Sequence, residues 1–216
     1  MATLARVRWR HLIAFLLLWT LLVLYPNPYR LLVSVYRMAR PPIEPAAVGE
    51  LVDLAPEDPA EIERFVLREF PYQYDWQTFN IPWYFPTVPE AMENRTGDCK
   101  TRFVVLASLL EALDIPYRQT VSPTHFWIDY EGKEERGIEK QEYAWMIRDE
   151  EGTRFQVPRE DADHVWDSFK RAFWEHMPAG RKVLFVSGPP LTALLGWLSF
   201  RARQSGGRRR KHDETV

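Results

Sequence analysis

The sequence predicts an α+β domain with hydrophobic segments at both ends of the chain. Helical patterns come first and strand-like runs follow, an order that favours helices packed on an antiparallel sheet. Two apolar runs without a charged residue, 12–25 and 183–200, lie close to the two ends. The chain of 216 residues holds one cysteine, so it has no internal disulfide framework.

The N-terminal run, LIAFLLLWTLLVLY, is short for a membrane span, which takes about 20 residues. Apolar character nevertheless extends to about Pro28. A cleaved signal peptide is the alternative, but no small-x-small cleavage site directly follows Tyr25, and we favour an uncleaved anchor. We therefore assign residues 1–40 to a membrane anchor and a juxtamembrane segment.

The C-terminal run, VLFVSGPPLTALLGWLSF, is the second hydrophobic segment, which we place at residues 181–200. Gly188-Pro189-Pro190 predicts a break in this helix, because proline cannot donate the backbone hydrogen bond. A kinked span, a re-entrant segment and an interfacial helix all fit the pattern. The alternative is a core segment of the domain.

Charge is concentrated at the ends of the chain. The net charge is −2, and a nucleic-acid binder would normally carry a basic face, so we expect no nucleic-acid partner. Arg6, Arg8 and Arg10 open the chain, and a basic tail at 201–216 closes it. The positive-inside rule places that tail in the cytoplasm, and two spans would leave the middle domain outside the cell membrane. Lipid and other membrane proteins are the expected partners.

The first part of the middle domain combines a linker, a helix and an aromatic segment. Residues 41–57 open with two prolines and are interpreted as a linker. Asp58-Pro59-Ala60-Glu61 predicts a capped helix start, with the helix ending near Phe70. Residues 71–90 are rich in aromatic residues and proline. They either form a substrate groove or pack their rings on the core.

The rest of the domain predicts one central helix, four strands and a last helix. Residues 99–113 are apolar on most faces and predict a buried helix, capped by Thr96 or Asp98. Strands are expected at about 118–121, 125–130, 143–148 and 154–157. The segment 161–180 contains an amphipathic helix that lies at a membrane interface or packs on the domain.

Cys99 and His125 are the residues with the clearest chemistry. Cys99 opens the predicted central helix, and a helix N-terminus favours the thiolate form of cysteine. His125 follows 26 residues later on a predicted strand and is placed to act as a general base. A lone cysteine is more often an inert core residue. The surrounding residues favour the nucleophile instead.

Those surrounding residues resemble the transglutaminase-like superfamily, which shares a papain-like core. Arg95-Thr-Gly-Asp-Cys99-Lys, followed by VVLASLLEALDIPYR, is similar to the family pattern R-x-G-D-C, helix, L-x-x-L-G-I-P-A-R. Asp114 stands where the family has glycine, and Tyr117 where it has alanine. His125-Phe-Trp-Ile-Asp129 resembles the family's H-A-W-V-E strand, and Tyr72-Gln-Tyr74 its Y-x-Y segment. The match covers about residues 58–158, so we assign residues 58–160 to this domain.

The resemblance implies a nucleophile-bearing central helix packed on an antiparallel sheet, and a Cys–His–Asp triad. Trp145-Met-Ile-Arg-Asp149 fits the family's spacing for the acid, although the usual D-P-T is missing after it. A hairpin centred near Gly137 would also set Asp149 opposite His125. Asp129 is the alternative, but it lies roughly 13 Å from His125 along the same strand.

The expected roles follow from this chemistry. The Cys99 thiolate attacks an amide carbonyl, His125 protonates the leaving amine, and Asp149 orients the imidazole. The backbone N–H of Cys99 and a second donor, Asn94 or Trp83, hold the oxyanion. Asp98 is interpreted as a helix cap. No metal ion or cofactor is expected.

The predicted function is that of a membrane-anchored cysteine enzyme that cleaves or transfers a peptide or protein amide. Hydrolysis, deamidation and acyl transfer share the same thioester, and the absence of a calcium-site signature resembles microbial proteases of this family more than animal cross-linking enzymes. The alternative is a catalytically silent, membrane-tethered binding or assembly module with the same fold.

Overall fold

The computed structural model describes residues 9–135 and 137–213, with side chains described as far as Arg201. The chain divides into two compact units, Met1–Pro28 with Pro178–Val216, and Tyr29–Met177. The basic residues Arg6 and Arg8, and the side chains of the predicted basic tail beyond Arg201, lie outside the described part.

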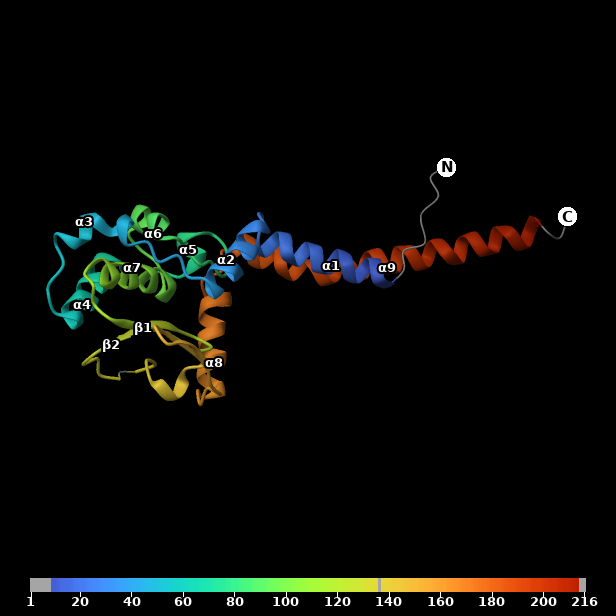
Figure 1. The fold of residues 1–216 in the computed structure, drawn as a ribbon. Helices are drawn as coiled ribbons and strands as arrows, with labels where there is room; N and C mark the ends of the chain where they lie inside the picture. Colours follow the sequence, from blue (N-terminus) through green and yellow to red (C-terminus); the bar gives the residue numbers. More distant parts are fainter. Residues whose placement is uncertain (1–8, 136, 214–216) are drawn as a thin grey trace. The chain divides into compact units, whose positions relative to one another are not determined.

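The first unit pairs α1 (Trp9–Leu24) with α9 (Ala179–Asp213) in antiparallel fashion, as Figure 1 shows. The indole Nε1 of Trp19 donates to the carbonyl of Leu184 at 2.8 Å. Arg181, near the start of α9, donates to the carbonyl of Val23, near the end of α1. The sequence separation of these contacts fixes the relative direction of the two helices.

The predicted helix break at Pro189 and Pro190 is wrong, because α9 continues through both residues. Hydroxyl groups next to the prolines bond to nearby carbonyls: Ser187 Oγ donates to Leu184, and Thr192 Oγ1 to Gly188, each at 2.8 Å. Neighbouring helices and Ser/Thr side chains are the features that let proline stay inside an apolar helix. Here α1 is the neighbouring helix, and Ser187 and Thr192 supply the hydroxyl groups.

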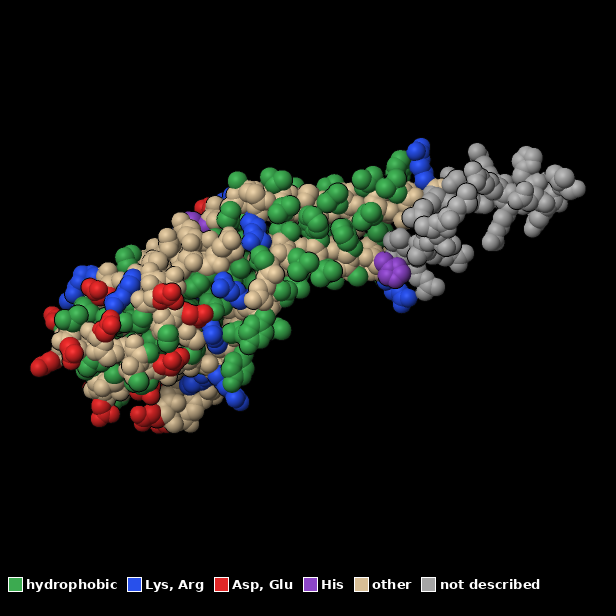
Figure 2. Space-filling model, turned by 90° about the horizontal axis from the view of Figure 1, so that it is seen from above, with side chains coloured by type: hydrophobic (Ala, Val, Ile, Leu, Met, Phe, Trp, Pro, Cys, Tyr) green, Lys and Arg blue, Asp and Glu red, His purple; other side chains and the backbone are tan. Residues whose placement is uncertain are grey.

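Apolar side chains cover much of the exposed surface of this unit (Figure 2). They include Leu17, Leu18, Val183, Val186 and Phe200, each more than half exposed. Among the described residues, Ala179–Arg201 is long and apolar enough to cross a membrane. Helix α1 passes the same test only when it is counted together with α2 (Tyr29–Ala39).

The second unit is an α+β domain with a four-stranded antiparallel sheet, which confirms the predicted α+β class. The strands lie in the order β2-β1-β3-β4. Their bounds are β1 (Tyr117–Val121), β2 (Phe126–Tyr130), β3 (Met146–Asp149) and β4 (Gly152–Phe155). The four predicted strands all exist.

The predicted pairing of the second strand with the third is wrong. Thr120 of β1 pairs with Trp127 of β2 on one side and with Ile147 of β3 on the other. The central position of β1 separates β2 from β3 by a full strand. The chain between β2 and β3 is therefore a long connection and not a simple hairpin.

Helix α7 (Cys99–Ala112) is the buried centre of the domain and covers one face of the sheet (Figure 1). Nearly every residue from Cys99 to Leu110 is buried, as its uninterrupted apolar sequence predicts. Phe126, Ile128 and Tyr130 of β2 point to the same core. Asp98 caps the helix by accepting from the Lys100 backbone N–H at 2.9 Å, which confirms its interpretation as a cap.

Further helices surround α7. They are η1 (Pro45–Val48), α3 (Gly49–Val52), α4 (Pro59–Glu69), α5 (Asp75–Thr78) and α6 (Val88–Asn94). The start of α4 confirms the predicted Asp58 cap, whose carboxylate accepts from Ala60 and Glu61. The segment expected as a linker instead packs on α7, because Val48 and Leu51 are buried apolar side chains of the core.

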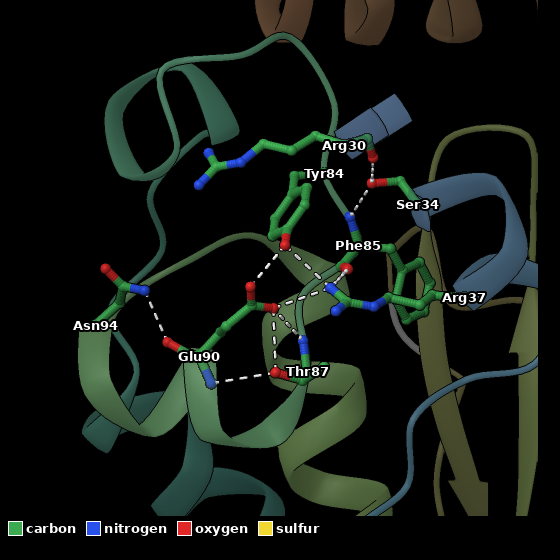
Figure 3. Close-up of polar contacts among 8 residues, drawn as sticks. All are labelled: Arg30, Ser34, Arg37, Tyr84, Phe85, Thr87, Glu90 and Asn94. Atoms are coloured by element: carbon green, nitrogen blue, oxygen red, sulfur yellow. Dashed lines mark hydrogen bonds and ion pairs between the residues drawn. The ribbon is translucent and has the colours of Figure 1, made fainter. Parts of the chain in front are cut away.

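Helix α2 belongs to the domain and not to the anchor to which we assigned residues 1–40. Figure 3 shows how it is held: Arg37 donates to Glu90 Oε2 at 2.9 Å, to Tyr84 Oη at 3.0 Å and to the Phe85 carbonyl at 2.9 Å. Ser34 bonds to the Phe85 backbone N–H. Phe85 and Tyr84 are themselves buried, so this end of the aromatic segment packs in the core.

The last helical segment of the unit combines α8 (Ala162–Phe169) with one π-helical turn, η3 (Lys170–Glu175). Trp166 and Phe169 are more than half exposed. Farther along, the carbonyl of Phe173 accepts from Trp76 Nε1 at 2.8 Å, and His176 stacks on Tyr74. The end of the segment thus packs on the domain, while Trp166 and Phe169 of α8 stay largely exposed. Short helix η2 (Gln141–Tyr143) lies between β2 and β3.

Candidate active site

The structure brings Cys99 and His125 together. Cys99 is the first residue of α7 and its side chain is buried. His125 directly precedes β2, and the two side chains line the same cavity. Cys99 opens the helix on which the sequence placed it, and His125 lies one residue before the strand on which the sequence placed it.

The turn between β1 and β2 fixes the position of His125. Ser122 Oγ accepts from the backbone N–H groups of Thr124, at 3.2 Å, and of His125, at 3.0 Å. The imidazole also stacks on the Trp127 ring, with 5.9 Å between centroids and 17° between planes. The ring therefore has few orientations open to it.

Glu139 is the carboxylate that contacts His125. Its Oε1 lies 2.9 Å from His125 Nε2, and its Oε2 lies 2.8 Å from Lys133 Nζ. Lys133 also pairs with Glu63 at 2.7 Å. No sequence pattern pointed to Glu139, because it lies in the charged connection between β2 and β3, outside every predicted strand.

Charges around His125 favour its protonated form. Burial by itself would lower the pKa of His125, but the neighbouring Cys99 and Glu139 raise it to about 9. Burial likewise opposes ionisation of Glu139, yet the bond from His125 and the charge of Lys133 hold the pKa of Glu139 below its ordinary value. Near neutral pH the pair is therefore imidazolium and carboxylate.

Asp149 does not face His125, contrary to the predicted triad. Its Oδ2 pairs with Arg154 at 2.6 Å, at the far end of the β3–β4 turn. The physical reason is the strand order, since β1 lies between β2 and β3. Asp149 instead lines a separate cavity with Tyr117 and Arg148.

Asp129, the alternative acid, is buried but has other partners. It accepts from Thr120 Oγ1 at 2.6 Å, from Gln141 Nε2 at 2.6 Å and from Trp127 Nε1 at 3.1 Å. Trp127 in turn stacks on His125. Asp129 thus acts on the indole that supports the imidazole, and not on the imidazole itself.

A buried ion cluster anchors the start of α7. Lys100 Nζ lies 2.9 Å from Asp75 Oδ2 and also pairs with Asp98. Asp75 additionally accepts from the Tyr84 backbone N–H at 2.7 Å. Burial and the charge of Asp98 raise the pKa of Asp75, while the two carboxylates raise the pKa of Lys100 against the effect of burial. The cluster ties α5 to the turn that carries Cys99.

The segment before α5 also reaches this turn. Gly97 and Tyr72 form a parallel bridge, and the Gln73 N–H donates to the Gly97 carbonyl at 2.9 Å. A side chain at Gly97 would have its Cβ 2.1 Å from Thr101 Oγ1, so only glycine fits there. Burial and the neighbouring Cys99 raise the pKa of Tyr72. Tyr72 is a site residue that the family-like Y-x-Y segment pointed to without giving it a role.

The two oxyanion candidates are not part of this arrangement. Asn94 is exposed, and its Nδ2 donates to the Glu90 carbonyl of its own helix at 2.7 Å (Figure 3). Trp83 is partly buried and does not line the cavity beside Cys99. Tyr72 does line it.

That cavity has a volume of about 70 Å³, enough for a few water-sized groups. Its polar lining includes Glu63, Tyr72, Arg102, His125 and Glu139 beside Cys99. The remainder is apolar, with side chains from α4, α7 and β2: Val66, Leu67, Phe103, Leu106, Phe126, Trp127 and Ile128. The described residues include no cluster of three or more side chains arranged to hold a metal ion.

Comparison with known proteins identifies no relative: no family model matches the chain, and no curated protein or solved structure matches it. The chemistry of the Cys99 and His125 site therefore follows from the geometry of the residues around it.

Proposed function

We propose that this protein is a cysteine enzyme that acts on a peptide or protein amide through a thioester, with a transglutaminase-like core. The observation that carries the proposal is that Cys99, at the start of a buried helix, lines the same cavity as His125, which lies 2.9 Å from Glu139. A thiol, an imidazole and an orienting group are the three parts of a cysteine nucleophile. Glu139 takes the place that we predicted for Asp149.

In the proposed reaction, the Cys99 sulfur attacks the amide carbonyl carbon and forms a tetrahedral oxyanion. Collapse breaks the C–N bond, and the amine leaves with the proton of His125. Glu139 occupies Nε2, which leaves Nδ1 to exchange the proton at the sulfur. Water or an amine then attacks the thioester, gives its proton to His125 and releases the thiolate.

The oxyanion needs two donors in this scheme. The first is the backbone N–H of Cys99, which belongs to the first turn of α7 and has no acceptor within the helix. We assign the second to the Tyr72 hydroxyl, because Tyr72 lines the cavity beside Cys99 and Asn94 bonds within its own helix.

We also propose that α1 and α9 anchor the enzyme in a membrane, with the domain extracytoplasmic and the basic tail in the cytoplasm. The support is the exposed apolar surface of the helix pair and the length of Ala179–Arg201. Extraction of the protein from membranes by detergent but not by alkaline carbonate tests the anchor.

The rate of Cys99 alkylation by iodoacetamide at pH 7 tests the proposed enzyme. We expect Cys99 of the full-length protein to react at least about 10-fold faster than Cys99 of His125→Ala, because the imidazole takes up the thiol proton. His164→Ala is the matched control, since His164 also pairs with a carboxylate, Glu160, at 2.8 Å.

The same alkylation rate in all three proteins would contradict the enzyme proposal. It would favour the second candidate function, a binding or assembly module that uses the same fold without a reactive thiol. The burial of Cys99, which is only 8% exposed, is the observation that favours this module.

A further inference from the structure

Arg102 is a cation that lines the active-site cavity. It follows Cys99 by three residues on α7, so the two side chains lie on the same side of the helix, and both line the cavity. The other charged groups of the lining are paired: His125 with Glu139, and Glu139 and Glu63 with Lys133. Within the described part of the chain, Arg102 has no ion-pair partner.

Two contacts hold the guanidinium in place. Its Nε donates to the Phe70 carbonyl at 2.9 Å, and its central carbon lies 5.2 Å from the centroid of the Tyr72 ring. Neither contact uses the two terminal nitrogens, Nη1 and Nη2, which have no acceptor among the described residues. The group is half-buried, so an anion bound there would be only partly exposed to water.

The free edge of a guanidinium presents parallel N–H groups that match the two oxygens of a carboxylate. The cavity admits a group of only a few atoms, and a carboxylate is of that size. The natural anions of a peptide substrate are its C-terminal carboxylate and the side chains of Asp and Glu.

We propose that Arg102 binds a substrate carboxylate next to the amide that Cys99 attacks, so that the enzyme selects acidic peptides. This inference rests on the proposed function of Cys99. Arg102 would act as a specificity-determining residue and take no part in proton transfer.

The test compares an anionic and a neutral alkylating reagent, iodoacetate and iodoacetamide, on the full-length protein. In Arg102→Gln we expect the ratio of the iodoacetate rate to the iodoacetamide rate to fall about 10-fold, the effect of one lost charge-assisted contact. The iodoacetamide rate should stay within about 3-fold. Arg118→Gln is the matched control, because Arg118 is exposed and lines a different cavity.

An unchanged ratio in Arg102→Gln would overturn the proposal. An equal loss of both rates would also overturn it, since Arg102 would then act on the thiolate and not on an anion. Failure of the enzyme proposal itself looks different: iodoacetamide would react slowly in the wild type as well, with no effect of His125→Ala.

Protection of Cys99 identifies the source of the carboxylate. N-acetyl-Ala-Ala, its C-terminal amide and N-acetyl-Glu amide are tested separately for slowing of iodoacetamide alkylation. Protection by the first but not the second assigns a C-terminal carboxylate, and protection by the third assigns an acidic side chain. Loss of protection in Arg102→Gln is expected in either case. No protection by any of the three would contradict the proposal.

Discussion

His125 depends on two neighbours that lie far apart in the sequence. Cys99 precedes it on α7, and Glu139 follows it in the connection to β3. Both raise its pKa and thereby stabilise the imidazolium. Because the pKa of His125 is raised from about 6.5 to about 9, its protonation stabilises the folded state fully below about pH 6.5. That contribution disappears as the pH rises through about 9.

Replacement of Glu139 tests this dependence at the residue scale. In Glu139→Gln one of the two contacts that favour the imidazolium loses its charge, so the titration midpoint of His125 should fall by roughly one pH unit or more. Histidine NMR of the full-length protein in detergent micelles measures the midpoint.

Asp149→Asn is the control for that experiment. Asp149 pairs with Arg154, so its replacement should leave the His125 midpoint unchanged. If the His125 midpoint fell strongly in Asp149→Asn and not in Glu139→Gln, Asp149 would be the acid that acts on His125, as the sequence predicted.

At the scale of the element, the N-terminus of α7 is held by charges that water does not reach. Lys100 is about 4% exposed and lies between Asp75 and Asp98. Such clusters gain little stability overall, because desolvation offsets the attraction. They nevertheless fix a geometry, and here they fix the turn Gly97–Asp98 that precedes Cys99.

Lys100→Met should destabilise the protein strongly, by about 3–5 kcal/mol, because it leaves two buried carboxylates without their cation. Thermal unfolding in detergent micelles measures the loss. Adding Asp75→Asn should recover part of it, since one of the two unpaired charges is then removed. Lys170→Met is the surface control, because Lys170 pairs only at 3.8 Å with an exposed glutamate, and it should have little effect. If Lys100→Met unfolded at the same temperature as the wild type, the cluster of Lys100, Asp75 and Asp98 would not be formed.

At the scale of the whole molecule, the two compact units are stabilised by different contacts. The domain buries a continuous apolar core around α7. The helix pair of α1 and α9 instead depends on close approach at small residues, while its large apolar side chains face outward. This is the pattern by which helices associate in lipid.

Gly188→Ala should weaken the helix pair. An added Cβ would lie 2.8 Å from Trp19 Cδ1, and the Trp19 indole is itself fixed by its bond to Leu184. We expect a loss of about 1–3 kcal/mol, seen as a lower melting temperature in micelles. Gly180→Ala is the matched change on the same helix, where a Cβ meets nothing within 4 Å. Equal melting temperatures for the two variants would argue against the α1–α9 contact.

Local patterns in the sequence predicted most of the elements. Asp58 and Asp98 predicted helix starts, the apolar run after Cys99 predicted a buried helix, and strand-like runs predicted the strands. These features depend on neighbours within a few residues, which a sequence displays directly. The proline pair in α9 was misinterpreted because a local rule ignores Trp19 and the adjacent hydroxyls.

The sequence by itself determined the α+β class and the apolar ends of the chain. It also singled out Cys99 and His125 as candidate site residues. Only the tertiary structure decided which carboxylate meets the imidazole. Pairing of consecutive strands would have set Asp149 there, but β1 pairs with both β2 and β3. That long-range pairing moves Asp149 away and leaves the connection between β2 and β3 free to place Glu139 against His125. Strand order depends on pairing between residues far apart in the sequence, which no short stretch of sequence contains.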